Sequence, residues 1–468
     1  MPRQGARDRR PVGSLCRLPE QASTCTGVDR DRGRLTEVFV KGGTRKMKPP
    51  PAGLFAGIDS GARDHQVCAL SPTGKILGNR SFAHSGDGLS ALLDWLDSLS
   101  HGELGEVYVA IEVPHGPVVE TLLERGCKVF AINPKQLDRF RDRFSLAGAK
   151  DDRRDAYVLA HTLLTDMHCF RAIKLDDPLV IQVRQWSRIY EELMAERSRL
   201  TNRMREQLRR YFPQYLQLTN DVGESWILAL WKVIPTPERA LKTSPRKIEK
   251  LLKEHKIRRV TPSQVLSALR KTPLCVAPGA AQAAIAYIAL LIDRLQLTNQ
   301  QIAQCRKTID TLVDQLTDSA EEGDDESKRE QRDIDILRSI PGVGRIVLAT
   351  LLGEASQALR DRDYSALRAL SGTAPITIRS GQSWRVVMRR ACHPRLRYAC
   401  YHWARVAIQC DARSREIYQR ARSRGKTHGT ALRTVADHLL RVACSMLRSG
   451  TYYDPNHTQA AQAKQVVA

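Results

Sequence analysis

The order of strand-like and helix-like stretches between residues 54 and 172 limits the fold more than any other feature of the sequence. The run Leu54–Ile58 is short and apolar, as in a buried strand. A second strand is expected near 66–70, and a Ser-Pro-Thr-Gly turn leads into a third at 75–82. The elements expected after it are a helix with leucines at 89–96, a strand at 107–111, a helix at 118–125, a strand at 128–132 and a helix opening near Asp151. Three strands followed by alternating helices and strands predict a mixed α/β sheet.

The middle of the chain is expected to be helical. Apolar residues recur every three to four positions from Trp186 to Tyr211, and again from about Ala284 to Leu316. In the second stretch eight of the ten positions in this frame are apolar, which predicts a coiled coil with Asn299 setting its register. An ordinary helix packed on a globular domain is the alternative.

The C-terminal part combines a glycine-rich turn with a high density of positive charge. The segment Ile340-Pro341-Gly342-Val343-Gly344 predicts the turn of a helix-hairpin-helix element. Gly342 and Gly344 would allow backbone N–H groups to approach a phosphate. Residues 376–450 contain 16 Lys and Arg against three acidic residues, and the whole chain has a formal charge of +23. Positive charge attracts polyanions, so nucleic acid is the expected partner, with a solvated basic face as the alternative.

Four acidic residues stand at the ends of predicted elements. Asp59 follows the first strand, Glu112 follows the strand at 107–111, and Asp152 and Asp155 lie three residues apart on one helix face. The element order is typical of a ribonuclease-H-like sheet, in which the first and fourth strands can be neighbours. Asp59 and Glu112 would then meet, and the helical pair would close the site. Converging carboxylates need cations, and Mg²⁺ or Mn²⁺ would equip them for phosphoryl transfer. Each residue alone is an ordinary turn or cap residue.

Four segments resemble the DEDD-motif insertion-sequence transposases, which are also described as bridge-RNA-guided serine recombinases. The segments are Gly57–Asp59, Ile111–Glu112, Ala149–Ala156 and Ile340–Gly344. The resemblance covers about residues 54–455 and implies a RuvC-like (RNase H-like) catalytic domain, a coiled coil and a mainly helical C-terminal transposase domain.

The same resemblance assigns catalytic roles to individual residues. It places the four metal-binding acidic positions at Asp59, Glu112, Asp152 and Asp155. The sequence Lys-Asp-Asp departs from the more usual Lys-Thr-Asp, so Asp151 is an ambiguous neighbour. The resemblance further implies that Ser380, and not Ser371, attacks a DNA phosphate to form a phosphoserine linkage. The implied phosphate contacts are Arg379, Arg385, Arg389 and Arg390.

The expected organisation has five parts. They are a disordered basic leader at 1–53, the RuvC-like domain at 54–172, coiled-coil helices with a helical insertion near 218–280 and an acidic linker at 173–325, the transposase domain at 326–455 and a disordered tail at 456–468. Met47 precedes Lys-Pro-Pro-Pro and is a candidate for the native start.

Nucleic acids and further copies of the chain are the expected partners. The resemblance implies double-stranded DNA (element ends and target), a structured guide RNA, a homo-oligomer (dimer or tetramer), and a bacterial cytoplasm with the nucleoid as site of action. No membrane is expected, because the longest apolar run, from Ala280 to Ile292, is too short to span a bilayer and contains Gln282. A RuvC-like endonuclease that uses only metal and water, and a catalytically degenerate nucleic-acid-binding protein, are the alternatives. Tyr452 and Tyr453 are weaker nucleophile candidates because no basic cluster lies beside them.

Overall fold

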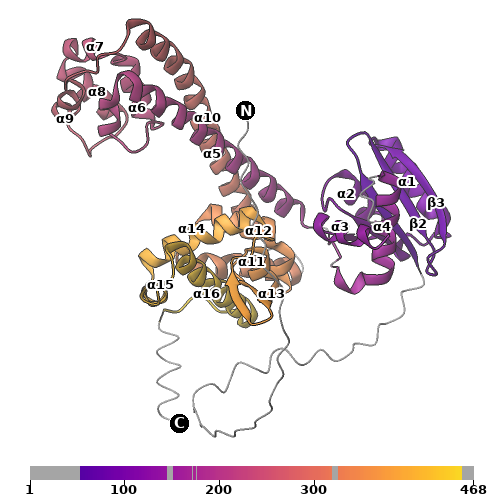
Figure 1. Ribbon diagram of the computed structural model, residues 1–468. Helices are drawn as coiled ribbons and strands as arrows, with labels where there is room; N and C mark the ends of the chain where they lie inside the picture. The colour runs from indigo at the N-terminus through magenta and orange to yellow at the C-terminus, as the bar shows by residue number, and fades with distance from the viewer. Residues whose placement is uncertain (1–52, 145–150, 171, 175, 319–324, 456–468) are drawn as a thin grey trace, which may run out of the picture. The chain divides into compact units, whose positions relative to one another are not determined.

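The computed structural model describes residues 53–144, 151–170, 172–174, 176–318 and 325–455. They form two compact units, one ending at Ile173 and the other beginning at Lys174 (Figure 1). Residues 1–52 of the predicted leader, the predicted tail, most of the acidic run, and Ala149 and Lys150 of the DEDD-like segment lie outside the described residues.

The first unit is built on a five-stranded mixed sheet with the spatial order β3-β2-β1-β4-β5. β1 (Leu54–Ser60) pairs antiparallel with β2 (Asp64–Leu70), which pairs antiparallel with β3 (Ile76–Ala83). On its other edge β1 runs parallel to β4 (Val107–Ile111), and β4 runs parallel to β5 (Lys128–Ala131). The structure confirms the predicted mixed sheet, and the first and fourth strands are neighbours, as in an RNase H-like domain.

Helices cover both faces of this sheet, because successive residues of a strand point to opposite sides. α1 (Gly86–Leu99) and α2 (Pro117–Glu124) pack on the face that presents Ala56 and Ile58. α4 (Asp152–Asp166) packs on the opposite face, against Phe55. The remaining helical segments of this unit are η1 (Leu104–Glu106), α3 (Pro134–Asp142) and η2 (Met167–Cys169).

The helix α3 was not expected from the sequence. Its nine residues, PKQLDRFRD, are mostly polar, and only Leu137 is buried. A helix with so few apolar positions has no stripe at the helical period to mark it.

Gly57 in the middle of β1 allows α4 to lie directly against the sheet. A Cβ atom at this position would lie 2.1 Å from the Ala156 carbonyl oxygen and 2.4 Å from the Ala160 amide nitrogen. Both are backbone atoms of α4, so a side chain here would displace the helix itself. Gly57 therefore sets the spacing between β1 and α4, and with it the position of the first turn of the helix.

Two long helices, α5 (Pro178–Tyr211) and α10 (Pro278–Asp318), run through the second unit (Figure 1). The first part of α5 shares a core with the last part of α10, and the last part of α5 shares another core with the first part of α10. The two helices are therefore antiparallel. An 18-residue window of α10 has a mean hydropathy of 1.3, enough by length and composition for a membrane span, but core helices pass the same test. The coiled coil stays a prediction.

The side chain of Asn299 in α10 forms hydrogen bonds to α5 and to the segment that follows α5. Its Oδ1 accepts a hydrogen bond from Arg197 Nε at 2.7 Å, and its Nδ2 donates to the Gly223 carbonyl at 3.0 Å. The segment between the long helices gathers at one end of the pair (Figure 1). Its helices are η3 (Pro213–Gln217), α6 (Ser225–Val233), α7 (Pro237–Lys242), α8 (Pro245–Glu254) and α9 (Pro262–Leu269).

The C-terminal elements gather at the other end of the helical pair and share the core formed by the first part of α5 and the last part of α10 (Figure 1). They are α11 (Asp325–Ser339), α12 (Arg345–Arg360), α13 (Tyr364–Leu370), β6 (Ile376–Ser380), β7 (Ser383–Val387), α14 (Pro394–Cys410), α15 (Ala412–Ser423) and α16 (His428–Ser449). The hairpin of β6 and β7 was not expected, because each strand has only five residues and no buried face to mark it.

Candidate active site and nucleic-acid interface

Asp59 and Glu112 lie at the carboxyl ends of two adjacent parallel strands. β1 and β4 are paired up to Ile58 and Ile111, so Asp59 and Glu112 are the next residues on the two chains. Asp59 has the same parity as Phe55, which belongs to the core under α4, and the alternation of side chains therefore directs Asp59 to that face. Asp59 lies within β1, which extends to Ser60, and not after the strand as the sequence suggested. Both carboxylates are half-buried.

The first turn of α4 lies at the same end of the sheet. Ala156 packs at Gly57, two residues before Asp59. Leu164, near the other end of α4, is the nearest neighbour of Gly74 in the turn between β2 and β3. α4 therefore runs antiparallel to β1, with its N-terminus toward Asp59.

The three acidic residues at the start of α4 have different surroundings. Asp151 is the N-cap residue, and its side chain accepts a hydrogen bond from a backbone N–H of the first turn. Asp152 is exposed. Asp155 is only 1% exposed, and both of its oxygens accept hydrogen bonds from Arg141 of α3, at 2.6 Å from Nε and 2.7 Å from Nη2. Arg141 also donates to Asp138 at 2.6 Å. This bidentate pair neutralises the most buried of the predicted catalytic carboxylates.

The four predicted carboxylates share one end of the sheet without forming a ligand cluster. Among the described residues, the group of three whose possible ligand atoms all lie within 4.8 Å is Asp166, His168 and Cys169, at the far end of α4. The topology therefore brings together the elements that carry the predicted site, while Asp155 is engaged by an arginine.

A histidine pair lies on the other face of the sheet beside this site. His65 of β2 is opposite Ser60, and its Nε2 lies 2.8 Å from His84 Nδ1. His65 Nδ1 and Ser60 Oγ are buried without a hydrogen-bond partner among the described residues. Burial, together with the charge of His84, lowers the pKa of His65. These residues could not be recognised from the sequence, because a lone histidine in a strand gives no signal until its neighbours are known.

The structure places Ser380 at the exposed tip of the β6–β7 hairpin. Ser380 is paired with Ser383, and Gly381 in the turn has φ 54°. Arg385 is paired with Ile378 and therefore lies on the same face of the hairpin as Ser380, whereas Arg379 lies on the opposite face, paired with Trp384. Of these two predicted phosphate contacts, only Arg385 shares a face with the serine.

Arg389 and Arg390 follow the hairpin and differ in their surroundings. Arg390 is exposed, and its carbonyl accepts a hydrogen bond from Arg397 at 3.3 Å. Arg389 is half-buried, and its Nε is buried without a partner among the described atoms. An arginine without an acceptor in a basic region is a candidate for contact with an anion.

The turn between α11 and α12 is held by packing. Gly342 has φ 83°, and a Cβ atom there would lie 2.8 Å from the Ala407 amide nitrogen of α14. Trp403 of α14 donates to the Pro341 carbonyl at 2.9 Å. Gly344 is the N-cap of α12, and its N–H already donates to the Gly342 carbonyl at 3.1 Å. Glycine is therefore required at 342 by its positive φ and by the close packing of α14. Phosphate binding by this turn stays a prediction.

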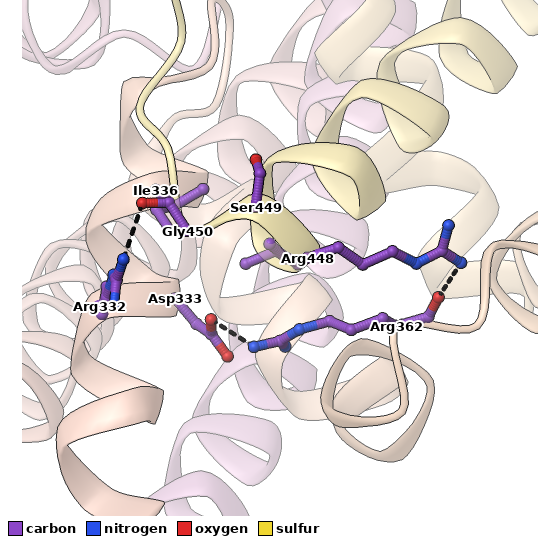
Figure 2. A pocket seen from close by; sticks show the side chains of 8 residues that line it. Arg332, Asp333, Ile336, Arg362, Arg448, Ser449 and Gly450 are labelled. Atoms are coloured by element: carbon purple, nitrogen blue, oxygen red, sulfur yellow. Dashed lines mark hydrogen bonds and ion pairs between the residues drawn. The ribbon is translucent and has the colours of Figure 1, made fainter.

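A polar cavity of about 360 Å³ lies between α11 and the end of α16 (Figure 2). Arg332 donates to the Gly450 carbonyl at 3.0 Å, and Arg448 donates to the Arg362 carbonyl at 2.7 Å. Arg362 is buried and donates to Asp333 at 2.6 Å, which leaves its Nε without a partner among the described residues. These bonds hold carbonyls at helix ends, so the arginines of this cavity are explained by the fold.

Comparisons with known proteins match both units. Residues 56–213 match a family described as transposase, of the DEDD type found in IS110, and residues 334–419 match the transposase IS116/IS110/IS902 family. A protein of Sinorhizobium fredii named as transposase y4uE is 53% identical over 232 residues, which are 49% of this chain and 62% of that protein. A Streptomyces coelicolor protein named as the mini-circle transposase for IS117 is 30% identical over 86% of this chain and 95% of its own length. A 43.6 kDa protein of insertion element IS110 from the same organism is 26% identical over 86% of this chain and 96% of its own length.

The five-stranded mixed sheet of the first unit is consistent with an RNase H-like DEDD domain, the type of domain that the first of these families describes. The chain belongs to the IS110 family of insertion-sequence transposases.

Proposed function

We propose that this transposase cuts and rejoins DNA with two sets of residues, the carboxylates of the first unit and Ser380 of the second. One observation carries the proposal. Asp59, Glu112 and the first turn of α4 lie at the same end of the sheet, on the face that α4 covers. Carboxylates gathered at one edge of such a sheet are suited to hold cations against a phosphodiester.

The donor set suits Mg²⁺ or Mn²⁺. Asp59, Glu112 and Asp152 supply carboxylate oxygens, the hard ligands that these ions prefer. Asp155, whose two oxygens are bound by Arg141, would add two further ligand atoms if a cation took the place of the arginine. Bound there, divalent ions would stabilise the charge that develops on the attacking and leaving oxygens of phosphoryl transfer. Asp151 accepts a hydrogen bond from its own helix as the cap, which supports Asp152 as the ligand.

Ser380 is suited to nucleophilic attack by its exposure at the tip of a hairpin. Its Oγ would give up a proton and form a bond to phosphorus, while the bond from phosphorus to one deoxyribose oxygen breaks and releases a sugar hydroxyl. Attack by a hydroxyl of another strand would reverse these changes, restore a phosphodiester and free the serine. Arg385, on the same hairpin face, would contact the phosphate, and Arg379, Arg389 and Arg390 would bind further along the DNA.

A tyrosine nucleophile is less well supported. The Tyr453 hydroxyl donates to Asp411 at 3.0 Å, and burial together with the charge of Asp411 raises the pKa of Tyr453 to about 12. A phenol held in this way is hard to ionise. Ser380 is the better candidate on geometric grounds, because its hydroxyl is exposed at a hairpin tip whereas that of Tyr453 is bound to Asp411.

The proposal includes a structured guide RNA, double-stranded DNA at the element ends and target, and a dimer or tetramer acting at the nucleoid. The 16 Lys and Arg residues of segment 376–450 give the second unit the charge to bind nucleic acid backbones. In the proposed oligomer, Ser380 of one copy would act with the carboxylate site of another copy.

The deciding experiment compares Ser380→Ala with Ser383→Ala, its exposed partner across the hairpin. The full-length protein is incubated with Mg²⁺, DNA carrying its own element ends, and RNA transcribed from the flank of its gene. We expect the parent protein and Ser383→Ala to form a denaturant-resistant protein–DNA adduct and Ser380→Ala to form none. Continued cutting by Ser380→Ala would support the water-only endonuclease instead.

A second variant tests the carboxylates independently of the serine. Asp59→Asn should abolish both cutting and adduct formation while the protein still binds DNA. Undiminished cutting by Asp59→Asn would contradict the metal site. Absence of any cutting by the parent protein with every combination of DNA and RNA would support the catalytically degenerate alternative.

A further inference from the structure

A second cavity of the C-terminal region, of about 290 Å³, lies between the end of β7 and the helices α14 and α16. Its lining includes two arginines, Arg397 and Arg433, and two tyrosines, Tyr398 and Tyr401. The volume is just below the range of about 300–1,000 Å³ for ligand sites, so the cavity suits one small group and not a duplex.

The two arginines have poor partners inside the protein. Arg397 donates to Cys392 Sγ from Nε at 3.0 Å and from Nη2 at 2.6 Å, and also to the Arg390 carbonyl. Arg433 lies 2.6 Å from Met388 Sδ and donates to Thr430 Oγ1 at 3.0 Å. Thiol and thioether sulfurs are weak acceptors. Neither guanidinium forms an ion pair with an acidic residue in the described part of the chain.

The nearest acidic residue along α16 is already engaged. Asp437 accepts two hydrogen bonds from Arg368, at 3.0 and 3.1 Å, and a third from Thr373 at 3.2 Å. Burial and the charge of Arg397 lower the pKa of Arg433 from its ordinary value. Two half-buried like charges without a counter-charge are an unfavourable arrangement that an anion would relieve.

The aromatic residues indicate which anion fits. The wall of the cavity is mainly apolar, and Tyr398 at its edge is 64% exposed. An inorganic ion gains no binding energy from an apolar, aromatic surface. A nucleotide does, because its base stacks on an aromatic ring while its phosphate binds arginine. We propose that this cavity binds one nucleotide of a nucleic acid strand, with the phosphate between Arg397 and Arg433 and the base against Tyr398.

This site is separate from the proposed catalytic residues. Met388 at the cavity follows β7 directly and stands five positions after Ser383 at the hairpin tip. At about 3.4 Å per residue the cavity lies about 17 Å from the tip along the hairpin. A nucleic acid strand bound in this cavity would continue along the hairpin toward Ser380. Substitutions of the cavity residues leave the serine itself unchanged. The nucleotide could belong to DNA or to RNA, since both carry the same phosphate and stacking base.

The test measures binding without divalent metal, so it is independent of cutting. The full-length protein is titrated into a fluorescent single-stranded 12-mer, as DNA in one arm and as RNA of the same sequence in the other. The variants are Arg433→Gln and Tyr398→Ala, with Arg332→Gln as a control that removes one charge from the other cavity. We expect Arg433→Gln to weaken binding at least about tenfold and to reduce the salt slope by about one, and Tyr398→Ala to weaken binding at least about fivefold.

Each outcome has a defined meaning. A loss for DNA alone or RNA alone identifies the source of the nucleotide, and a loss for both shows that the site accepts either. Equal weakening by Arg332→Gln and Arg433→Gln would overturn the proposal, since net charge would then explain the effect. The melting temperature of Arg433→Gln should be unchanged or higher, because one of two like charges is removed. A lower melting temperature with unchanged binding would show that Arg433 serves only the fold.

Discussion

Substitution of Gly57 by alanine tests how the fold positions the proposed active site. The new methyl group would lie 2.1 Å from the Ala156 carbonyl oxygen, whereas ordinary contact begins at 3.4 Å. α4 would therefore have to move from β1 by about 1.3 Å, and overpacking of this kind costs about 1–3 kcal/mol of unfolding free energy. The same movement would carry Asp152 and Asp155 away from Asp59, and a displacement of about 1 Å at reacting groups lowers rates by about 10²-fold.

Two measurements check this prediction. Urea unfolding followed by circular dichroism reports the stability, and DNA cutting at saturating Mg²⁺ reports the site. Gly86→Ala is the matched control, since Gly86 begins α1 and nothing lies within 4 Å of the position of its added Cβ. The control should keep both values or gain up to about 1 kcal/mol of stability. Normal stability and a normal cutting rate for Gly57→Ala would refute the reasoning that this contact sets the site.

Three further predictions follow from particular contacts. Arg141→Gln should destabilise the protein by about 3–5 kcal/mol, because it leaves the buried Asp155 unpaired, and millimolar Mg²⁺ should restore more stability to it than to the parent in urea unfolding. Asn299→Ala should cost about 1–3 kcal/mol in the same assay, whereas the exposed neighbour Gln300→Ala should change little. Burial lowers the pKa of His65 and of four other histidines (His161, His393, His402 and His438) below the ordinary histidine value of about 6.5. The unfolded chain then binds more protons, so stability should fall as the pH is lowered below about 6.5, and an unchanged urea midpoint between pH 7.5 and 5.5 would contradict this.

Local patterns in the sequence determined most elements of the first unit. The strand at Leu54–Ser60 and the strand at Val107–Ile111 are buried on both faces, so their apolar runs mark them clearly. The long helices show an apolar period over many turns, which identifies them as helices with one buried face. Elements without a buried face, such as α3 and the β6–β7 hairpin, leave no such pattern.

Only the tertiary structure decided which side chains meet. Arg141 and Asp155 lie on different helices, and nothing in the local sequence shows that one neutralises the other. Arg397 and Arg433 are 36 residues apart, and their shared cavity appears only when α14 and α16 pack beside the hairpin. Periodicity records which face of an element is buried, because burial repeats with the backbone geometry. A pairing between polar groups from distant elements has no period, so it becomes visible only once the chain has folded.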